Sequence, residues 1–183
     1  MTSFPIVICQ HPDESAHPFT TSRMADLGAT SVQCSIGLDI DEQSIKGLFK
    51  HQRASSVALL YTNHSYGQHE SFVIDFEQPP KPLADAFTKF TETIDGLIVL
   101  DGTWRNTREI MLRNAWLAEL PTLTLIGLPK SLYSIRKTSK ESVVSTLEAV
   151  ACVLAFTDSD FDVNTFQAPL RALVELQKNY QSN

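Results

Sequence analysis

The sequence predicts a single α/β domain, and three observations lead to that prediction. Short apolar runs, several of them rich in β-branched residues, alternate along the chain with amphipathic stretches of helical spacing. The chain has 183 residues, which is the usual size of one domain and enough to bury a sizeable core. Hydrophobic residues make up 43% and charged residues 20%, which is typical of a globular protein and excludes a disordered or fibrous one. We therefore expect one domain over residues 1–183.

The first half of the chain contains strand-like runs separated by helical stretches. The strand-like runs are rich in β-branched and aromatic residues. Gly28 closes the first helical stretch, and the alternating run before Pro79 has the pattern of an edge strand. In order, we expect strand Phe4–Cys9, helix Thr20–Leu27, strand Ser31–Ser35, helix Glu42–His51, strand Ser56–Tyr61, strand Phe72–Phe76 and helix Leu83–Phe90.

The second half begins with a continuously apolar run, Gly96–Leu100, which is typical of a buried parallel strand. Thr103 is placed to cap the helix that follows, and Pro121 is placed to stop it. Ser145 and Glu148 have the spacing of a capping box at the head of an apolar helix. We expect helix Trp104–Glu119, strand Thr122–Ile126, a loop over residues 127–140, a helix from Ser145, and a last helix with Phe166, Leu170, Leu173 and Val174 on one face.

Cysteine usage and the length of the apolar runs bear on compartment and metal binding. Cys9, Cys34 and Cys152 form no Cys-x-x-Cys, and the histidines lack paired-ligand spacing, so we expect buried thiols in a reducing compartment and no metal site. The longest wholly apolar stretch, Ala149–Phe156, is far shorter than the roughly 20 residues of a membrane span. The N-terminus lacks the features of a signal peptide. We expect a soluble, cytoplasmic protein without a membrane partner.

The chain is acidic overall, but its charges are unevenly distributed. Its formal net charge is −6 and its pI is near 5.3, which excludes a general basic coat. Between residues 102 and 140, seven cations face two anions, which gives +5 there and leaves −11 for the rest of the chain. A phosphate-bearing partner favours such segregation, and a solvated helix face with an Arg105–Glu109 pair is the alternative. The cations are Arg105, Arg108, Arg113, Lys130, Arg136, Lys137 and Lys140, and the anions are Glu109 and Glu119.

The tetrapeptide Asp101-Gly102-Thr103-Trp104 lies where a buried strand is expected to end and a helix to begin. Ligands of open α/β sheets bind outside the carboxyl ends of the strands, and helix N-termini attract anions. The alternative is that Asp101 only caps the helix and Trp104 only fills the core. The tetrapeptide alone does not decide between a ligand site and a structural role.

Three other segments have both a functional and a structural interpretation. Residues 131–137 offer two hydroxyls, an aromatic ring and two cations, which suits a nucleotide-like ligand or an ordinary surface loop. Residues 145–149 form a helix head that either receives a ligand carboxylate or is only a capping box. Near the end of the first strand, His11 and Glu14 either handle protons or bond to the backbone. The chain has no Gly-rich phosphate loop, no Gly-x-Ser-x-Gly elbow and no Cys-His signature.

In combination, these segments resemble the DTW-domain family, which is named for an Asp-x-Thr-Trp motif. That motif is Asp101–Trp104 here, and it follows an apolar strand as expected. Residues 131–137 and 145–149 resemble the next two signatures of the family in order and spacing. His11–Glu14 with Thr20 or Thr21 resembles its N-terminal signature. The resemblance covers residues 6–156.

The resemblance implies a fold related to the SPOUT class: an open, mostly parallel sheet with helices on both faces and a C-terminal trefoil knot. Knots are rare, and no pattern of residues in this chain suggests one. Many bacterial members carry an additional N-terminal cysteine cluster that looks like a zinc ribbon. This chain starts at the first strand, so we expect a single DTW domain without the ribbon and a modest, salt-sensitive affinity for tRNA.

The resemblance also implies tRNA-uridine aminocarboxypropyltransferase activity. In that reaction S-adenosylmethionine donates its 3-amino-3-carboxypropyl group to N3 of a tRNA uridine and leaves 5′-methylthioadenosine. Asp101 is then expected to act as general base or orienting acceptor, with Glu14 as the second choice. Trp104 or Tyr133 is expected to stack on the uridine. The expected catalytic residues are Asp101, Thr103, Trp104 and Glu14, the donor-binding residues are Leu100, Asp101, Leu128, Ser131, Tyr133, Arg136, Ser145 and Thr146, and the RNA-binding residues are Arg105, Arg108 and Lys137.

Three alternatives remain open from the sequence. A knotted methyltransferase would use the same donor and deliver its methyl group. A related transferase would modify ribosomal RNA with the same signatures. A non-catalytic RNA-binding module would need the basic segment and no donor site. The sequence leaves open whether the chain is a monomer or a homodimer.

Overall fold

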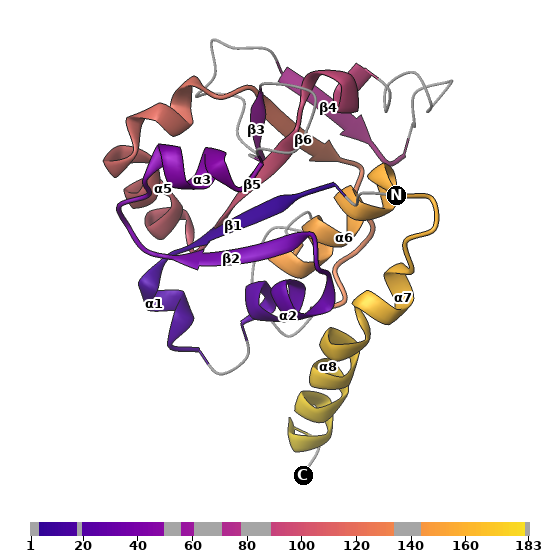
Figure 1. Cartoon of the computed structure of the whole chain (residues 1–183). Helices are drawn as coiled ribbons and strands as arrows, with labels where there is room; N and C mark the ends of the chain where they lie inside the picture. Colours follow the sequence, from indigo (N-terminus) through magenta and orange to yellow (C-terminus); the bar gives the residue numbers. More distant parts are fainter. Residues whose placement is uncertain are drawn as a thin grey trace.

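The computed structural model of the chain describes residues 4–17, 20–49, 56–60, 71–77, 89–133 and 144–181. Its strands are β1 Ile6–Gln10, β2 Val32–Ile36, β3 Val57–Leu60, β4 Ser71–Asp75, β5 Gly96–Asp101 and β6 Thr122–Ile126. Within these residues they form one six-stranded sheet in the order β2-β1-β5-β3-β6-β4, and every paired neighbour is parallel (Figure 1). The predicted open, parallel α/β sheet is confirmed.

Helices cover both faces of this sheet. The described helices are α1 Pro12–Ser15, α2 Thr21–Gly28, α3 Glu42–Gly47, α5 Trp104–Arg113, the 3₁₀-helix η1 Ala115–Glu119, α6 Thr146–Thr157, α7 Val163–Phe166 and α8 Ala168–Gln181. Apolar side chains of α2, α6, α7 and α8 pack on one face, and those of α3, α5 and η1 pack on the other (Figure 1). The predicted arrangement of helices on both faces is therefore confirmed.

Strand β1 shows why the middle of the sheet is apolar along its whole length. Ile6 and Ile8 point into the core under α2, α6 and α8, while Val7 and Cys9 point into the core under α3 and α5. All four side chains are buried, because successive residues of a strand face opposite sides and both sides are covered. β1 is the second strand of the sheet, so its carboxyl end lies between those of β2 and β5.

The strand predictions are confirmed, and their bounds differ from those observed by at most two residues. Strand β4 lies at the edge of the sheet, as its alternating pattern predicts. The helix predicted over residues 42–51 is shorter, because α3 ends at Gly47. The helix predicted over residues 83–90 falls mostly outside the described residues, and residues 89–93 are helical.

The single helix predicted over residues 104–119 is wrong, because α5 stops early and η1 follows. The break is at Asn114, whose backbone has φ −121° and ψ 72°. Its side-chain amide donates to the carbonyls of Ile110 and Leu38 and accepts from the N–H of Ile40, each at 2.7 Å. A short polar side chain that bonds to the backbone competes with helix continuation. The break therefore ties the end of α5 to the segment between β2 and α3.

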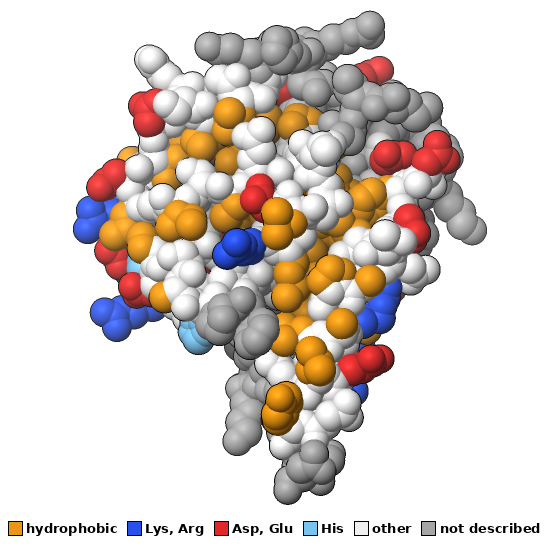
Figure 2. Space-filling model, turned by 60° about the horizontal axis from the view of Figure 1, so that its bottom comes forward, with side chains coloured by type: hydrophobic (Ala, Val, Ile, Leu, Met, Phe, Trp, Pro, Cys, Tyr) orange, Lys and Arg blue, Asp and Glu red, His pale blue; other side chains and the backbone are white. Residues whose placement is uncertain are grey.

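The predicted last helix consists of α7 and α8, which meet at Gln167. The four apolar residues predicted to share one face, Phe166, Leu170, Leu173 and Val174, are all buried, so that prediction is confirmed. Beyond them α8 extends away from the body of the molecule toward the C-terminus (Figure 1). Hydrophobic side chains are visible along this projection in Figure 2, and the exposed ones in α8 include Leu176 and Tyr180.

The trefoil knot and the relation to the SPOUT class stay predictions. The segment over residues 134–143 leads into α6 and lies outside the described residues. Among the described residues, no helix has both the length and the apolar content that a membrane crossing requires.

Candidate active site

The carboxyl ends of β1 and β5 lie side by side in the sheet, and the segments that follow them leave in opposite directions. After β1 the chain passes to β2 on one side, and after β5 it passes through α5 and η1 to β6 on the other (Figure 1). Open α/β sheets bind their ligands at such a switch point. The strand register places Gln10 opposite Asp101 here. The N-terminal signature and the Asp101–Trp104 motif therefore meet at one sheet edge.

Asp101 is the half-buried last residue of β5, and both of its carboxylate oxygens accept hydrogen bonds. Gln10 donates from its side-chain amide Nε2 to Asp101 Oδ2 at 2.8 Å. Thr146, the first residue of α6, donates from its hydroxyl to Asp101 Oδ1. The backbone carbonyl of Asp101 accepts from the N–H of His11 at 3.0 Å. Donors from two elements therefore fix the orientation of this carboxylate.

Glu14 of α1 lies against the start of α5. Its Oε1 accepts from the backbone N–H of Thr103 and from Nδ2 of Asn106, both at 3.2 Å. Thr103 Oγ1 accepts from the N–H of Asn106, which confirms Thr103 as the helix cap. A carboxylate at a helix N-terminus also interacts favourably with the helix dipole. We call Gln10, Glu14, Asp101, Thr103 and Asn106 the Asp101 corner.

Gly102 allows the two chain segments of this corner to approach each other closely. A Cβ atom at this position would lie 2.8 Å from Cβ of Asn106 and 3.4 Å from Cβ of His11. A larger residue would force α5 away from the end of β1. The second residue of the motif is therefore glycine, because a side chain would not fit between α5 and the end of β1.

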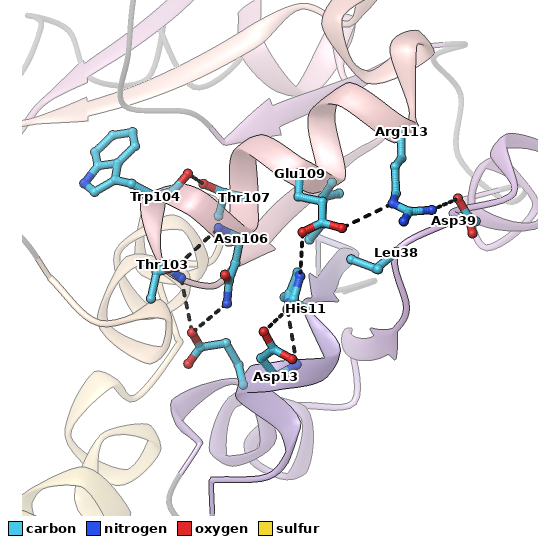
Figure 3. Close-up of polar contacts among 12 residues, drawn as sticks. His11, Asp13, Leu38, Asp39, Thr103, Trp104, Asn106, Thr107, Glu109 and Arg113 are labelled. Carbon is cyan, nitrogen blue, oxygen red and sulfur yellow. Dashed lines mark hydrogen bonds and ion pairs between the residues drawn. The ribbon is translucent and has the colours of Figure 1, made fainter.

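His11 is buried beneath the start of α5 and connects it to α1. Its Nδ1 accepts from the N–H of Asp13 at 3.1 Å, so His11 caps α1. Its Nε2 lies 3.6 Å from Oε2 of Glu109, beyond hydrogen-bond distance (Figure 3). Glu109 in turn contacts Arg113 at 3.4 Å, and Arg113 contacts Asp39 at the same distance. These polar and charged side chains link α5 to the segments that follow β1 and β2.

Glu148 of α6 organises a second group of polar residues. It is 5% exposed, and its carboxylate accepts from four donors: Ser131 Oγ at 2.8 Å, Leu132 N at 2.6 Å, Ser145 N at 2.8 Å and Ser145 Oγ at 2.7 Å. Ser145 and Glu148 form the predicted capping box, which is confirmed. The same carboxylate holds the loop after β6 against the head of α6. We call Ser131, Leu132, Ser145 and Glu148 the Glu148 corner.

The two corners are joined through neighbouring residues of α6. Thr146 contacts Asp101, and the adjacent Ser145 contacts Glu148. The structure thus brings together segments that are 45 residues apart, namely the Asp101–Trp104 motif and the head of α6. It also brings the segment beginning at Ser131 to the same helix head.

The structure also describes four other residues that were predicted to bind the donor. Leu100 is half-buried beside the core under α5, and Leu128 and Tyr133 are half-buried beside the core under α6. The hydroxyl of Ser131 is already bonded to Glu148, so its described role is in holding the loop. The predicted contact through Arg136 lies outside the described residues.

The predicted RNA-binding cations of α5 are on its surface. Arg105 and Arg108 are exposed and lie one helical turn apart. The alternative pairing of Arg105 with Glu109 is wrong, because Glu109 contacts Arg113 and His11 instead. The alternative that places Trp104 in the core is also wrong, because Trp104 is 56% exposed. Lys137 lies outside the described residues.

Burial sets the chemistry of the three cysteines. It raises the pKa of the Cys9 thiol to about 12, and the pKa values of Cys34 and Cys152 to about 11. The negative charges of Asp26 and Asp101 add to the shift at Cys34. All three thiols are unpaired and are protonated at neutral pH, which is the state of inert buried cysteines. The described part of the chain contains no group of three or more His, Cys, Asp or Glu side chains that could hold a metal ion.

Sequence reasoning missed two residues of the Asp101 corner. Gln10 is 2% exposed and continues an apolar strand, and a polar residue buried at the end of such a strand is the signal that points to a partner. Asn106 is buried in the first turn of α5, where it joins Thr103 to Glu14. The sequence contains no comparable signal for Asn106, because a side-chain amide in the first turn of a helix does not by itself point to a partner.

Fold and site together define an open parallel α/β protein with a polar site at its switch point. The chain belongs to the DTW-domain family, because the sequence profile described as "DTW domain" matches residues 1–178. This confirms the resemblance drawn from the motifs.

Three curated relatives have the name "tRNA-uridine aminocarboxypropyltransferase 2". The proteins of Macaca fascicularis and Mus musculus are each 25% identical over 175 residues, which covers 94% of this chain and 54% of the relative. The protein of Drosophila melanogaster is 27% identical over 179 residues, which covers 94% of this chain and 64% of the relative. The chain thus spans between half and two thirds of the length of these relatives. No solved structure matches the chain significantly.

Proposed function

We propose that this chain is a tRNA-uridine aminocarboxypropyltransferase that transfers the 3-amino-3-carboxypropyl group of S-adenosylmethionine to N3 of a tRNA uridine. Membership in the DTW family and the shared name of three relatives support this proposal. The single observation that carries it is the contact of Asp101 with Thr146, which joins two signature segments at the switch point of the sheet. Unpaired thiols fit a cytoplasmic location.

The residues at this edge fit a nucleoside-like donor. Strand-end backbone at Leu100 and loop backbone at Leu128 supply main-chain groups for an adenine, beside half-buried apolar side chains. The head of α6 supplies N–H groups for a carboxylate, and the Glu148 carboxylate fixes the position of that head. Arg136 is a further proposed partner of the carboxylate. Bound there, S-adenosylmethionine would supply an electrophilic γ-carbon next to a sulfonium leaving group.

Asp101 is the proposed proton acceptor. N3 of uridine carries a proton and becomes a strong nucleophile once it is removed. The bond from N3 to the γ-carbon forms as the carbon–sulfur bond breaks, sulfur keeps the electron pair as neutral 5′-methylthioadenosine, and the N3 proton passes to Asp101. Each carboxylate oxygen of Asp101 has two lone pairs and one described donor, so an acceptor position remains on each. Glu14 is the second choice, because its Oε1 is occupied by Thr103 and Asn106.

The start of α5 is the proposed contact with tRNA. Trp104 is exposed at the first helical position and offers a ring for stacking on an unpaired base. Arg105 and Arg108 lie on the exposed surface of the same helix and suit phosphate groups. Lys137 is proposed as a further phosphate contact from the basic segment.

The decisive experiment incubates the purified chain with unmodified tRNA and S-adenosylmethionine that carries ¹³C in its aminocarboxypropyl group. Nucleoside mass spectrometry is expected to find the label on uridine, with 5′-methylthioadenosine as the second product. A gain of one methyl group with S-adenosylhomocysteine would instead show a methyltransferase. Absence of both products and of donor binding in calorimetry would favour a non-catalytic RNA-binding module. Ribosomal RNA in place of tRNA tests the remaining alternative substrate.

A further inference from the structure

Gln10 stands out among the residues near the proposed site because it is polar, almost completely buried and outside every signature segment quoted above. Its residue is 2% exposed, and its amide Nε2 donates to Asp101 Oδ2 at 2.8 Å. The register of β1 and β5 places the two residues directly opposite each other. The backbone carbonyl of Gln10 accepts from the N–H of Gly37 at 3.1 Å, so the segment after β2 holds its backbone.

We infer that Gln10 is a positioning residue for Asp101, and that together with Thr146 it orients this carboxylate. The inference rests on the proposed function for its catalytic meaning. Gln10 donates to Oδ2 and Thr146 donates to Oδ1, so a donor from each side of the site holds one oxygen. The remaining lone pairs of both oxygens thereby keep a fixed direction.

A buried amide needs a hydrogen-bond partner, and the partner of Gln10 is the carboxylate proposed to accept the proton. Replacing Gln10 with an apolar residue of similar volume would keep the packing of the strand and remove the donor. Loss of a hydrogen bond to a charged group changes an equilibrium by about 10- to 100-fold. The change is expected in the rate of transfer, while the binding of the donor substrate stays the same.

The test uses Gln10→Met and Gln10→Glu in the full chain, with Gln33→Glu as the matched control. Gln33 is exposed on the neighbouring strand β2 and lies outside the proposed site. The first readout is the crystal structure of each variant. The Asp101 carboxylate is expected to turn from its position in Gln10→Met, which removes the donor to Oδ2, and to turn further in Gln10→Glu, because a second carboxylate repels it. Gln33→Glu should leave the carboxylate in place.

Thr146→Val removes the second donor and should likewise turn the Asp101 carboxylate, and Thr146→Ser should restore its position. Thr146 belongs to another element, so this pair tests the arrangement independently of how Gln10 variants fold.

The second readout is the kinetics of transfer. In Gln10→Met, kcat is expected to fall about 10- to 100-fold with little change in KM for S-adenosylmethionine. An unchanged orientation of the Asp101 carboxylate in Gln10→Met and Thr146→Val would overturn the inference, even if kcat falls. A turned carboxylate in a chain that transfers nothing would support the inference and contradict the proposed function.

Discussion

The two carboxylates at the centre of the site differ in how fully their hydrogen-bonding capacity is used. Glu148 is 5% exposed and accepts from four donors, two of them from Ser145 and the other two from the loop after β6. Asp101 is half-buried and accepts from one donor on each oxygen. A carboxylate with two oxygens has about four acceptor positions. Glu148 therefore accepts twice as many hydrogen bonds from its own chain as Asp101 does, and Asp101 has an acceptor position left on each oxygen for a ligand.

This difference shows how one sheet edge combines rigidity with reactivity. The Glu148 corner fixes the head of α6, and α6 presents Thr146 to Asp101. Part of the Asp101 corner is therefore positioned by a helix whose head Glu148 holds in place. Loss of Glu148 should mainly affect stability, and loss of Asp101 should mainly affect activity.

The largest expected effect is on the rate of transfer in Asp101→Asn. Loss of a general base lowers kcat by about 10²- to 10⁴-fold, while folding is little changed because Gln10 can rotate its amide to accept from the new one. Single-turnover transfer to tRNA measures the rate. Asp160→Asn, in an exposed turn after α6, is the control and should keep wild-type activity. A wild-type rate in Asp101→Asn would remove Asp101 from any role in moving the proton.

The second effect concerns stability and sharpens the same comparison. Glu148→Gln replaces one acceptor oxygen by an N–H₂ group that faces donors from Ser131, Leu132 or Ser145. Burying donors without acceptors should lower the free energy of unfolding by about 2–3 kcal/mol, measured by urea denaturation. Asp101→Asn should change it by about 1 kcal/mol. Equal losses in the two variants would contradict the division between a structural and a chemical carboxylate.

How much of this site can be predicted from the sequence depends on the range of the interaction. The Ser145–Glu148 capping box and the Thr103 cap are local, because their partners are three residues apart, and both are predicted correctly. The contact of Gln10 with Asp101 joins residues 91 apart and depends on strand register and strand order. No local pattern encodes which residue lies opposite Asp101, so the structure is needed to show that Gln10 contacts it.

How well the fold is predicted depends on the range of the interactions in the same way. Buried strands such as Gly96–Asp101 are predicted correctly, because covered sheets need continuous apolar runs. The end of α5 is not, because Asn114 breaks the helix through bonds to Leu38 and Ile40, which are far away in the sequence. The sequence also predicts no order of strands, and the switch point between β1 and β5 follows from that order.

A third prediction concerns the charges beside the Asp101 corner. Replacing Arg105 and Arg108 together by Gln removes two proposed phosphate contacts on one face of α5. Affinity for tRNA is expected to fall about 10-fold at moderate salt, and the slope of log K against log salt should become shallower by about two. Filter binding over a salt series measures both. Arg171→Gln together with Lys178→Gln on α8 removes the same two charges and is the matched control, and an equal loss there would show that the effect is one of net charge alone.

A fourth, smaller effect tests whether the Asp101 corner also stabilises the fold. Thr103→Ala removes the oxygen that caps α5 through the N–H of Asn106. Loss of a cap lowers the free energy of unfolding by about 1 kcal/mol, which is less than the loss expected at Glu148. Thr103→Ser keeps the hydroxyl and should restore stability. A loss in Thr103→Ala as large as that in Glu148→Gln would show that the Asp101 corner contributes as much to stability as the Glu148 corner.

The smallest effect comes from a carboxylate outside both corners. Asp162 caps α7, and hydrogen bonds from Thr165 hold its pKa below the usual range, with smaller help from Asn164 N–H and the charge of Arg171. A carboxyl with a lowered pKa in the folded state adds stability above its unfolded pKa, near 4, and that stability disappears as the pH falls through the folded value. Asp162→Asn keeps a capping oxygen and loses the titration. The melting temperatures of the variant and the wild type should therefore differ most at neutral pH and converge as the pH falls through the lowered pKa of Asp162. A difference that stays constant across this range would show that the Asp162 charge makes no pH-dependent contribution, and that Asp162, like Glu148, acts through hydrogen-bond geometry.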